Sequence, residues 1–369
     1  MKKFFIALLS LASLLISLTV ASADTPVIRI VDKPHLNFDG TWRNNDLVTL
    51  LAPDGRLGKL VFSPAVGNRT WVIDAALVDE VVAMSGGYKF AKEEQKLGAI
   101  IATNWLNRLR MVTRANQVVA LPYGNADSAL LKSIAPSELT FYSNYANQRL
   151  AIVLGRPVTS QNGWGKGRSS LNYIFRKSYL ENRRELVGLS RVMSVDEVTH
   201  LRARLGSVLS PSLNSNDRAY FSYTSSAETD RVVSKLRIVS GRYQLTSESV
   251  KVPLTLVNNF ETSAVVSLSL IPMNGRVRVT NINEITIPPK SRMQLSVPFT
   301  VIAPGSTLVI AQFMTPTGTM VGKPSRLNLS LTIIDSRVAW FTTGAAVLLF
   351  LGAVAQSVRR VRRGRKNEE

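Results

Sequence analysis

The feature that most constrains this chain is a regular alternation of apolar and polar side chains in its C-terminal half. In Val266–Leu270 (VSLSL) and again in Leu327–Leu331 (LNLSL), every second residue is apolar. A period of two puts alternate side chains on opposite faces of a β-strand, one buried and one in solvent. A series of such segments follows Leu236, separated by turn signals such as Asn274-Gly275. We therefore predict an antiparallel, immunoglobulin-like β-sandwich over residues 235–335.

Short apolar runs alternate with helical patterns earlier in the chain. The runs that predict buried strands are Val27–Asp32, Lys59–Phe62, Thr70–Asp74 and Gln117–Pro122. Between the last two runs lies a segment with helical spacing. Its residues that share one face of the helix are Leu97, Ile100, Ile101, Trp105 and Leu109. Strands that alternate with helices indicate parallel β/α units. We therefore predict an α/β fold for residues 24–234, in the form of a partial or degenerate β/α-barrel-like domain.

A glycine-rich segment near residues 159–170 interrupts this pattern. Gly163, Gly165 and Gly167 stand beside Lys166 and Arg168, which superficially resembles a phosphate-binding loop. The spacing matches neither the P-loop nor the dinucleotide fingerprint. We interpret the segment as a flexible insert, with an anion site as the alternative.

Both ends of the chain are strongly hydrophobic. Residues 1–23 combine a charged start, an apolar stretch and a small-residue cleavage pattern, which predicts a secretory signal peptide, with an uncleaved anchor helix as the alternative. Residues 337–358 are long enough to cross a hydrocarbon core of about 30 Å, which predicts a transmembrane helix, with a buried core helix as the alternative. An arginine-rich tail, residues 359–369, follows. The positive-inside rule then predicts a single-pass cell-membrane protein with an extracytoplasmic N-terminal domain and a cytoplasmic tail.

Composition restricts the chemistry further. The chain has no cysteine, which excludes disulfides, thiolate metal sites and a cysteine nucleophile. Its two histidines, His35 and His200, are too few for a zinc site built from histidines. The formal net charge of +20 favours an anionic partner such as a wall polymer, lipid headgroups or an acidic protein. Export argues against nucleic acid, and a Lys/Arg-rich composition without any specific ligand is the alternative.

Acidic residues follow three of the predicted strands. Asp32, Asp74 and Asp127 stand where β/α barrels place catalytic groups, and two carboxylates that flank a sugar can cleave a glycoside as acid and base. These three are weak catalytic candidates, whereas His35, Tyr123 and Asp127 are ligand-binding candidates. A non-catalytic cleft and a structural role are the alternatives, because Asp74 and Asp127 each precede a predicted helix that they would cap. No Gly-x-Ser-x-Gly elbow is present, and we predict no metal and no cofactor.

Several segments, in a fixed order, carry a family resemblance. They are VDKPH (31–35), APDGRLGKL (52–60), VVALPYGNAD (118–127) and WFTTGAAVLLFLGAVAQSVRRVRRGR (340–365). Together they resemble an uncharacterised family of actinobacterial, membrane-anchored envelope proteins. The resemblance implies a signal peptide, a degenerate barrel similar to polysaccharide deacetylases and glycosidases, a β-sandwich and a C-terminal membrane helix. It also implies a gene adjacent to that of the lipid II flippase.

Two departures from the family pattern bear on function. Members are typically much longer, so this chain resembles a shortened member that lacks an N-terminal sandwich and part of the barrel. Where the family reads Pro-Tyr-Gly-Asp-Pro-Asp, this chain has Asn125 in place of the first acid. The paired metal histidines of the deacetylases are absent too, so the resemblance does not imply metal-dependent deacetylation.

These observations predict a non-enzymatic envelope protein that binds or scaffolds in cell-wall (peptidoglycan) biogenesis through a basic ectodomain. Its predicted partner is an anionic wall polymer or lipid-linked precursor, or a wall-synthesis membrane protein such as the lipid II flippase. A residual glycan hydrolase that uses the strand-end carboxylates is the first alternative. A passive structural ectodomain without a ligand is the second.

Overall fold

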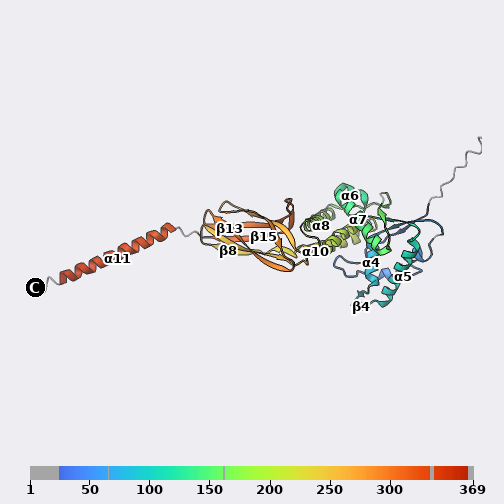
Figure 1. Cartoon of the computed structure of the whole chain (residues 1–369), viewed down its shortest axis with the longest axis horizontal. Helices are drawn as coiled ribbons and strands as arrows, with labels where there is room; N and C mark the ends of the chain where they lie inside the picture. The colour runs from blue at the N-terminus through green and yellow to red at the C-terminus, as the bar shows by residue number, and fades with distance from the viewer. Residues whose placement is uncertain (1–24, 65, 161–162, 333–335, 365–369) are drawn as a thin grey trace, which may run out of the picture. The chain divides into compact units, whose positions relative to one another are not determined.

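The computed structural model describes residues 25–64, 66–160, 163–332 and 336–364. The chain divides into two compact units, the first made of residues 1–170 and 206–218 and the second of residues 171–205 and 219–369. Figure 1 traces the chain through both units. The predicted signal peptide, residues 1–23, lies outside the described residues, as does the end of the basic tail from residue 365 onwards.

A parallel sheet forms the centre of the first unit. Its four strands, in the order β1-β2-β5-β6, are β1 (Val27–Ile30), β2 (Thr70–Ile73), β5 (Gln117–Ala120) and β6 (Thr159–Ser160). Every described pairing between them is parallel. The whole of β2 is buried, since it lies between two neighbouring strands and its side chains are covered on both faces of the sheet.

Helices connect these strands. They are α2 (Asp46–Leu51), α3 (Arg56–Phe62), α4 (Ala75–Ser85), α5 (Lys96–Thr113), α6 (Ser128–Ile134) and α7 (Pro136–Leu154). A two-stranded hairpin, β3 (Lys89–Phe90) with β4 (Glu93–Glu94), precedes α5. Helix α7 begins with a proline in its first turn and ends at Gly155, whose φ of 66° suits a residue without a Cβ.

Two local predictions for this unit were wrong. The run Lys59–Phe62 lies in helix α3, because Leu57 and Val61, four residues apart, point together into the core. Trp105 and Leu109 of α5 are fully buried as predicted, but Leu97 is 68% exposed and Ile100 57% exposed. The buried side of α5 instead runs through Gly98, Ala102, Trp105, Leu106 and Leu109, so Leu97 and Ile100 lie beside it.

The predicted barrel-like domain was also wrong. The described sheet is open, with β1 and β6 as its edges. A β/α barrel closes only when eight parallel strands return to pair with the first. After the two-residue strand β6, the chain continues into helices and then into antiparallel strands, so nothing in the described residues closes the ring.

The second unit contains a β-sandwich, which confirms that part of the prediction, and its described strand pairs are antiparallel except β8 with β15, which is parallel. One sheet has the order β12-β10-β14-β15-β8 and the other β11-β13-β9-β7. The strands are β7 (Leu236–Ile238), β8 (Gly241–Leu245), β9 (Ser249–Asn258), β10 (Ala264–Pro272), β11 (Val277–Val279), β12 (Ile282–Ile287), β13 (Ser291–Val301), β14 (Gly305–Met314) and β15 (Met320–Leu331). Alternate residues such as Leu254, Val266 and Leu327 are buried in the core.

Helices α8 (Tyr173–Val192), α9 (Asp196–Arg204) and α10 (Ser215–Val233), with the short 3₁₀ helix η1 (Leu205–Leu209), precede the sandwich. Helix α8 packs on β15 through Gly188, where a Cβ atom would come within 2.9 Å of the Met320 carbonyl oxygen. Glycine at this position thus allows the helix to approach the sheet closely.

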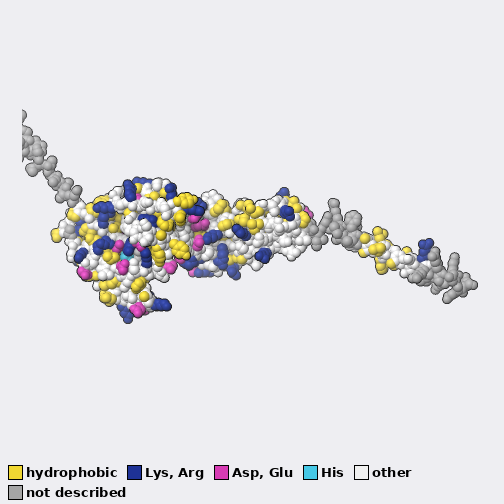
Figure 2. Space-filling model, turned by 180° about the vertical axis from the view of Figure 1, so that it is seen from behind, with side chains coloured by type: hydrophobic (Ala, Val, Ile, Leu, Met, Phe, Trp, Pro, Cys, Tyr) yellow, Lys and Arg dark blue, Asp and Glu magenta, His cyan; other side chains and the backbone are white. Residues whose placement is uncertain are grey.

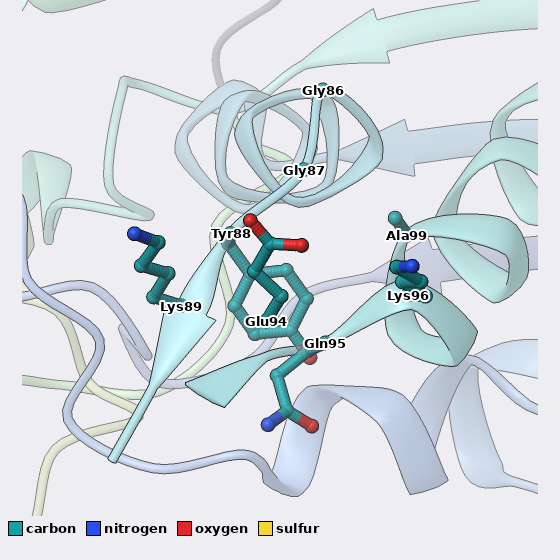
Figure 3. Close-up of a pocket in the computed structure, with 8 residues that line it drawn as sticks. All are labelled: Gly86, Gly87, Tyr88, Lys89, Glu94, Gln95, Lys96 and Ala99. Atoms are coloured by element: carbon teal, nitrogen blue, oxygen red, sulfur yellow. The ribbon is translucent and has the colours of Figure 1, made fainter. Parts of the chain in front are cut away.

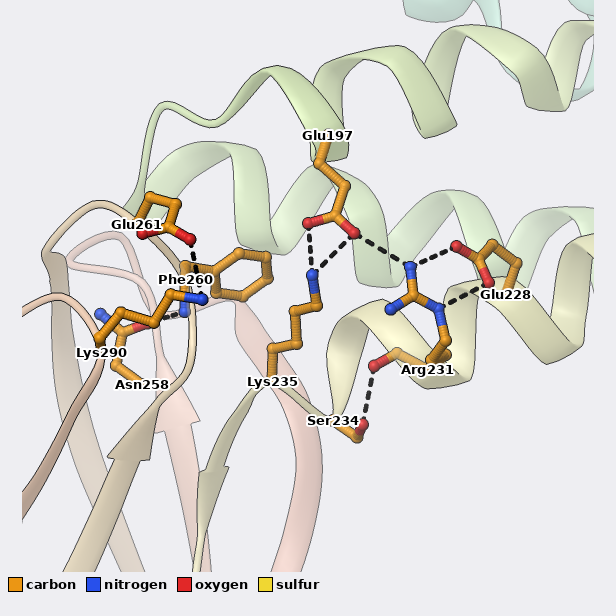
Figure 4. A network of polar contacts seen from close by, with 9 residues as sticks. All are labelled: Glu197, Glu228, Arg231, Ser234, Lys235, Asn258, Phe260, Glu261 and Lys290. Carbon is orange, nitrogen blue, oxygen red and sulfur yellow. Dashed lines mark hydrogen bonds and ion pairs between the residues drawn. The ribbon is translucent and has the colours of Figure 1, made fainter. Parts of the chain in front are cut away.

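A polar network joins α9, α10 and the start of β7 (Figure 4). The Glu197 carboxylate accepts hydrogen bonds from Lys235 Nζ at 2.6 and 2.8 Å and from Arg231 Nη2 at 3.0 Å. Arg231 also donates to Glu228, at 2.6 and 2.8 Å. Burial works to raise the pKa of Glu197, but the Lys235 and Arg231 cations outweigh it and lower that pKa.

The prediction of a C-terminal membrane span, and with it of a single-pass membrane location, was wrong. Among the described residues, no helix combines the length and the apolar character that crossing a bilayer requires. Helix α11 (Ser336–Gly364) covers the predicted segment, but its described side chains are continuously apolar only from Ala345 to Ala355, before Gln356 and Ser357.

Replacing Glu197 by Gln tests the network. We expect Glu197→Gln to lower the free energy of unfolding by up to about 1 kcal/mol at neutral pH, since the pairs are partly exposed. A carboxyl whose folded pKa is lowered stabilises the fold above its unfolded pKa, and this contribution disappears as the pH falls through the folded pKa. The difference from wild type should therefore vanish on acidification to about pH 3, as measured by urea denaturation.

Glu248→Gln is the control, because Glu248 is exposed and has no ion pair among the described residues. Equal losses in the two variants, or a loss that does not depend on pH, would contradict the assigned role of Glu197.

Candidate functional site

The carboxyl ends of β1, β2 and β5 bring the predicted site residues to one edge of the parallel sheet. Asp32 follows β1, Asp74 follows β2, and Tyr123 and Asp127 follow β5. Parallel strands end on the same side, so their C-terminal loops lie next to one another. The structure therefore places all of these residues on one rim, which we call the strand-end rim.

Asp74 joins two of the loops of the strand-end rim. Its Oδ1 atom accepts hydrogen bonds from the backbone N–H of Ala76, which caps helix α4, and of Gly124, both at 3.0 Å. The side chain is almost fully buried. Burial raises the pKa of Asp74 to about 7, despite the backbone hydrogen bonds and with a further contribution from the Glu80 carboxylate.

Asp32 and His35 form a second group at the end of β1. The Asp32 carboxylate lies 2.7 Å from Arg56 Nη2 and 3.6 Å from His35 Nε2, while His35 Nδ1 lies 3.0 Å from Asn44 Oδ1. Burial opposes a charge on the fully buried imidazole, but the neighbouring Asp32, Glu80 and Asn44 outweigh it and raise the pKa of His35. Burial would likewise raise the pKa of Asp32, and His35, Lys33 N–H and Arg56 together lower it.

Glu80 is a member of this group that the sequence did not reveal. It projects from α4 and accepts hydrogen bonds from the backbone N–H of His35, at 3.0 and 3.2 Å, and of Leu36, at 3.1 Å. An acidic residue in the middle of a helix, beside Asp79, has the sequence pattern of a solvated face. Its position among the buried residues of α4 is the one signal that could have identified it.

Tyr123 is held by its own polar contacts. Its hydroxyl donates to Asp79 Oδ2 at 2.8 Å, and Asp79 accepts a two-pronged hydrogen bond from Arg149. The ring packs edge-on against Tyr145, with 5.0 Å between the ring centroids. Tyr123 is only 1% exposed, so its hydroxyl does not face a ligand from solvent.

Asp127 caps helix α6 and accepts a hydrogen bond from the glycine-rich segment. Its Oδ1 accepts from the N–H groups of Ala129 and Leu130, and its Oδ2 accepts from Ser169 N–H at 2.7 Å. The guanidinium of Arg168 lies 3.8 Å away. Both oxygen atoms of Asp127 therefore have structural partners.

Asn125 stands where the family resemblance predicts an acid. Its backbone is left-handed, with φ of 50°, and its amide donates to the Ser212 hydroxyl at 3.2 Å. At the preceding Gly124, with φ of 75°, a Cβ atom would collide with Ser207. The turn is thus shaped by close packing.

The glycine-rich segment lies against the same edge of the sheet. Trp164 packs on the buried cluster of Val72, Val119 and Leu121, and Arg29 donates to its carbonyl oxygen at 2.5 Å. These contacts place the indole at the strand ends, where parallel sheets bind ligands.

A hollow of about 460 Å³ lies elsewhere on this unit, beside the β3–β4 hairpin (Figure 3). It is lined by Gly86, Gly87, Tyr88, Lys89, Glu94, Gln95, Lys96 and Ala99. In the view of Figure 3, Lys89 and Lys96 flank the Glu94 carboxylate. None of the carboxylates of the strand-end rim lines it.

On the described part of the chain, no group of three or more His, Asp or Glu side chains is arranged to hold a metal ion. The strand-end rim is a set of capping and ion-pair contacts, in which the pKa of Asp74 is raised to about 7 and that of His35 is raised as well.

Residues 174–369 match the model of a family of unknown function, DUF6049. The match covers more than half of the chain, so the chain belongs to this family. No curated protein matches the sequence.

Solved structures that match the chain cover about a quarter of it. They include a member of the MSP family of C. elegans, WR4, at 12% identity, covering 27% of this chain and 98% of that one, with a TM-score of 0.21. The E. coli chaperone DraB is similar at 10% identity over 27% of this chain and 55% of that one (TM-score 0.21). The PapD-like domain 7 of human CEP192 is similar at 13% identity over 27% of this chain and 87% of that one (TM-score 0.21). These scores are too low for any of them to bear on function.

The pKa of Asp74 generates a prediction. A carboxyl whose folded pKa is raised stabilises the fold fully below its unfolded pKa, and this contribution is lost as the pH rises through the folded value of about 7. Wild type should therefore lose up to a few kcal/mol of unfolding free energy between about pH 5 and pH 8. Asp74→Asn keeps an oxygen for the two N–H groups and should make this dependence shallower, leaving the part that comes from the raised pKa of His35.

Urea denaturation across that pH range is the measurement, with the exposed Asp54→Asn as control. A variant curve that still falls as steeply as wild type would show that another group titrates.

Proposed function

We propose that this chain is a non-catalytic binding module and that one face of its sandwich binds a linear polyanion. The face belongs to the sheet β11-β13-β9-β7. Arg237 of β7 opposes Val257 of β9, and Val257 opposes Arg292 of β13. Residues that oppose one another across strands share a face of the sheet. Both arginines therefore project from the outer side of this sheet, where both are solvent-accessible.

Two further cations project from the same face. Lys251 opposes Pro298, and Arg278 opposes Thr300. Both partners lie an even number of residues from Arg292 on β13, so all the side chains point the same way. We call Arg237, Lys251, Arg278 and Arg292 the cationic face.

The cationic face contains no carboxylate. Its remaining residues are uncharged, namely Ser249, Pro253, Thr255, Gln294, Ser296, Pro298, Thr300 and Val257, of which Val257 is fully buried between Arg237 and Arg292. Lys and Arg side chains occur over much of the surface in Figure 2, so charge alone does not locate a site. The distinguishing observation is a set of cations that no acidic residue of the same face neutralises.

The spacing of the cations favours a long ligand over a small ion. Arg237 and Arg292 lie near one end of the face, and Lys251 and Arg278 lie toward the other, six or more residues along β13. At about 3.4 Å per residue, that separation is roughly 20 Å. One compact anion does not reach both pairs, whereas a polymer with repeated charges does.

The family resemblance suggests which polyanion this is. We propose an anionic wall polymer as the partner, in the cell-wall biogenesis of an actinobacterium. A lipid-linked precursor carries similar charge, and the lipid II flippase would be a neighbour rather than a ligand of this face. The structural roles of Asp32, Asp74 and Asp127 support binding over catalysis.

Titration with poly(glycerol phosphate) tests the proposal. The full chain should bind this polymer, with dextran as the uncharged control, and the affinity should fall as salt is added. The double variant Arg237→Gln/Arg292→Gln should bind roughly tenfold more weakly, because two solvent-accessible charges are lost. Isothermal titration calorimetry measures both effects.

Lys177→Gln/Lys323→Gln is the matched control, since it removes the same charge from lysines paired with Glu181 and Asp230. It should stay close to wild type. Equal weakening in both double variants would show a response to net charge only, and no binding at all would favour a passive structural role without a ligand.

Residual glycan hydrolysis is the second candidate, and the pKa of Asp74 is the observation that favours it. A carboxyl that titrates near pH 7 suits a general acid. The full chain should then release sugars from wall glycans, and Asp74→Asn should abolish the release. Inert wild-type protein on a broad glycan panel rules this candidate out.

A further inference from the structure

A second hollow, of about 510 Å³, lies on the opposite sheet of the sandwich from the cationic face. It is lined by Arg242, Tyr243, Gln244, Ser306, Asn328, Leu329 and Ser330. These residues come from β8, β14 and β15, which are neighbours in the sheet β12-β10-β14-β15-β8. Arg242, Gln244, Ser306, Asn328 and Ser330 are exposed, while Leu329 is buried beneath them. The hollow therefore opens to solvent on the outer side of the sheet.

Strand register arranges the polar groups in two rows. In one row, Gln244 opposes Ser330, and Ser330 opposes Ser306. In the next row, Arg242 opposes Asn328. The rows lie two residues apart along the strands, or about 7 Å. Polar groups at this spacing can contact different positions of a single sugar-sized ring.

The chemistry of the lining is that of a site for hydroxyl groups. The carboxamides of Gln244 and Asn328 each offer both donors and an acceptor, and the serine hydroxyls do the same. A sugar hydroxyl is also a donor and an acceptor at once. A hydrogen bond between it and any of these side chains can therefore form in either direction. None of the lining residues is a carboxylate.

Arg242 adds a cation to one side of the hollow. It is exposed and has no ion pair among the described residues. A guanidinium presents a planar fork of donors that fits a carboxylate or a phosphate ester. The hollow thus combines one anion-binding group with several hydroxyl-binding groups.

An apolar patch continues the second row. Leu308 opposes Asn328, and Met273 N–H donates to the Leu308 carbonyl at 2.9 Å. Ile310 lies on the same face of β14, opposite Ile271. Met273 is 63% exposed and Ile271 55% exposed. A sugar ring has an apolar C–H face as well as hydroxyls, and exposed apolar side chains beside a polar hollow suit it.

We propose that this hollow, which we call the β8–β15 site, binds an acidic sugar residue. Arg242 holds the carboxylate or phosphate group, Asn328, Gln244 and Ser330 contact the hydroxyls, and Leu308 packs on the ring. The proposal does not rest on polyanion binding by the cationic face, because the two sites lie on opposite sheets and share no residue.

Binding of single sugars to the full chain is the test. Backbone amide NMR shifts at Asn328, Leu329 and Ser330 are followed on addition of glucuronate, glucose 6-phosphate or glucose. At least one acidic sugar should shift these amides and bind about tenfold or more tightly than glucose, since it adds a charge-assisted hydrogen bond. The two acidic probes show whether the anionic group is a carboxylate or a phosphate ester.

Arg242→Gln should weaken binding of the acidic sugar about tenfold and leave the weak binding of glucose unchanged. Arg326→Gln is the matched control, because Arg326 lies on the same sheet opposite Ile310 and outside the lining. It removes the same charge and should stay within about twofold of wild type. Asn328→Ala is a second variant, and it should weaken glucose and the acidic sugar alike, since it removes a hydroxyl contact.

Three results would overturn the proposal: no shift with either acidic sugar at millimolar concentration, equal binding of glucose and the acidic sugars, or equal losses in Arg242→Gln and Arg326→Gln. The variant Arg237→Gln/Arg292→Gln should bind the acidic sugar as wild type does, and Arg242→Gln should still bind poly(glycerol phosphate). Failure of either proposal is therefore visible separately from failure of the other.

Discussion

The buried Asp74 carboxylate is the contact on which the first unit depends. One oxygen atom of this side chain starts helix α4 through Ala76 N–H and holds the turn after β5 through Gly124 N–H. A buried carboxylate is costly unless donors surround it, and here the donors are backbone groups from two separate loops. The same burial raises its pKa, so the loops after β2 and β5 are coupled to a titrating group.

The remaining polar groups of the strand-end rim are engaged in the same way. Asp127 caps a helix and holds Ser169, Tyr123 donates to Asp79, and Glu80 accepts from the backbone next to His35. A catalytic carboxylate needs access to substrate as well as a suitable pKa. The indole of Trp164 packs on the apolar ends of β2 and β5, at the edge of the sheet where a substrate would lie. The first unit therefore uses its polar residues mainly for its own stability.

In the sandwich, by contrast, most polar side chains face solvent. Its core is mainly apolar, and most of its polar residues project outward from the two sheets with few acidic partners. The two outer faces also differ from each other. One bears cations at spread positions among uncharged residues, and the other bears Arg242 beside carboxamides, hydroxyls and an apolar patch, with Arg326 further along β15. Ligand binding is consequently proposed for this unit rather than for the strand-end rim.

Local pattern alone predicted the sandwich, the buried strands at Thr70–Asp74 and Gln117–Pro122, and the alternation of strands with helices, because periodicity is a property of neighbouring residues. It failed at Lys59–Phe62, because a short, mostly apolar run fits a strand or a helix equally well. It also failed to predict that the sheet stays open, because closure of a barrel depends on how many strands follow. Only the tertiary structure decided that Gly124 meets Asp74, fifty residues earlier, and that Arg242 stands opposite Asn328. Register and long-range contacts arise from the packing of whole elements, so no local stretch of sequence contains them.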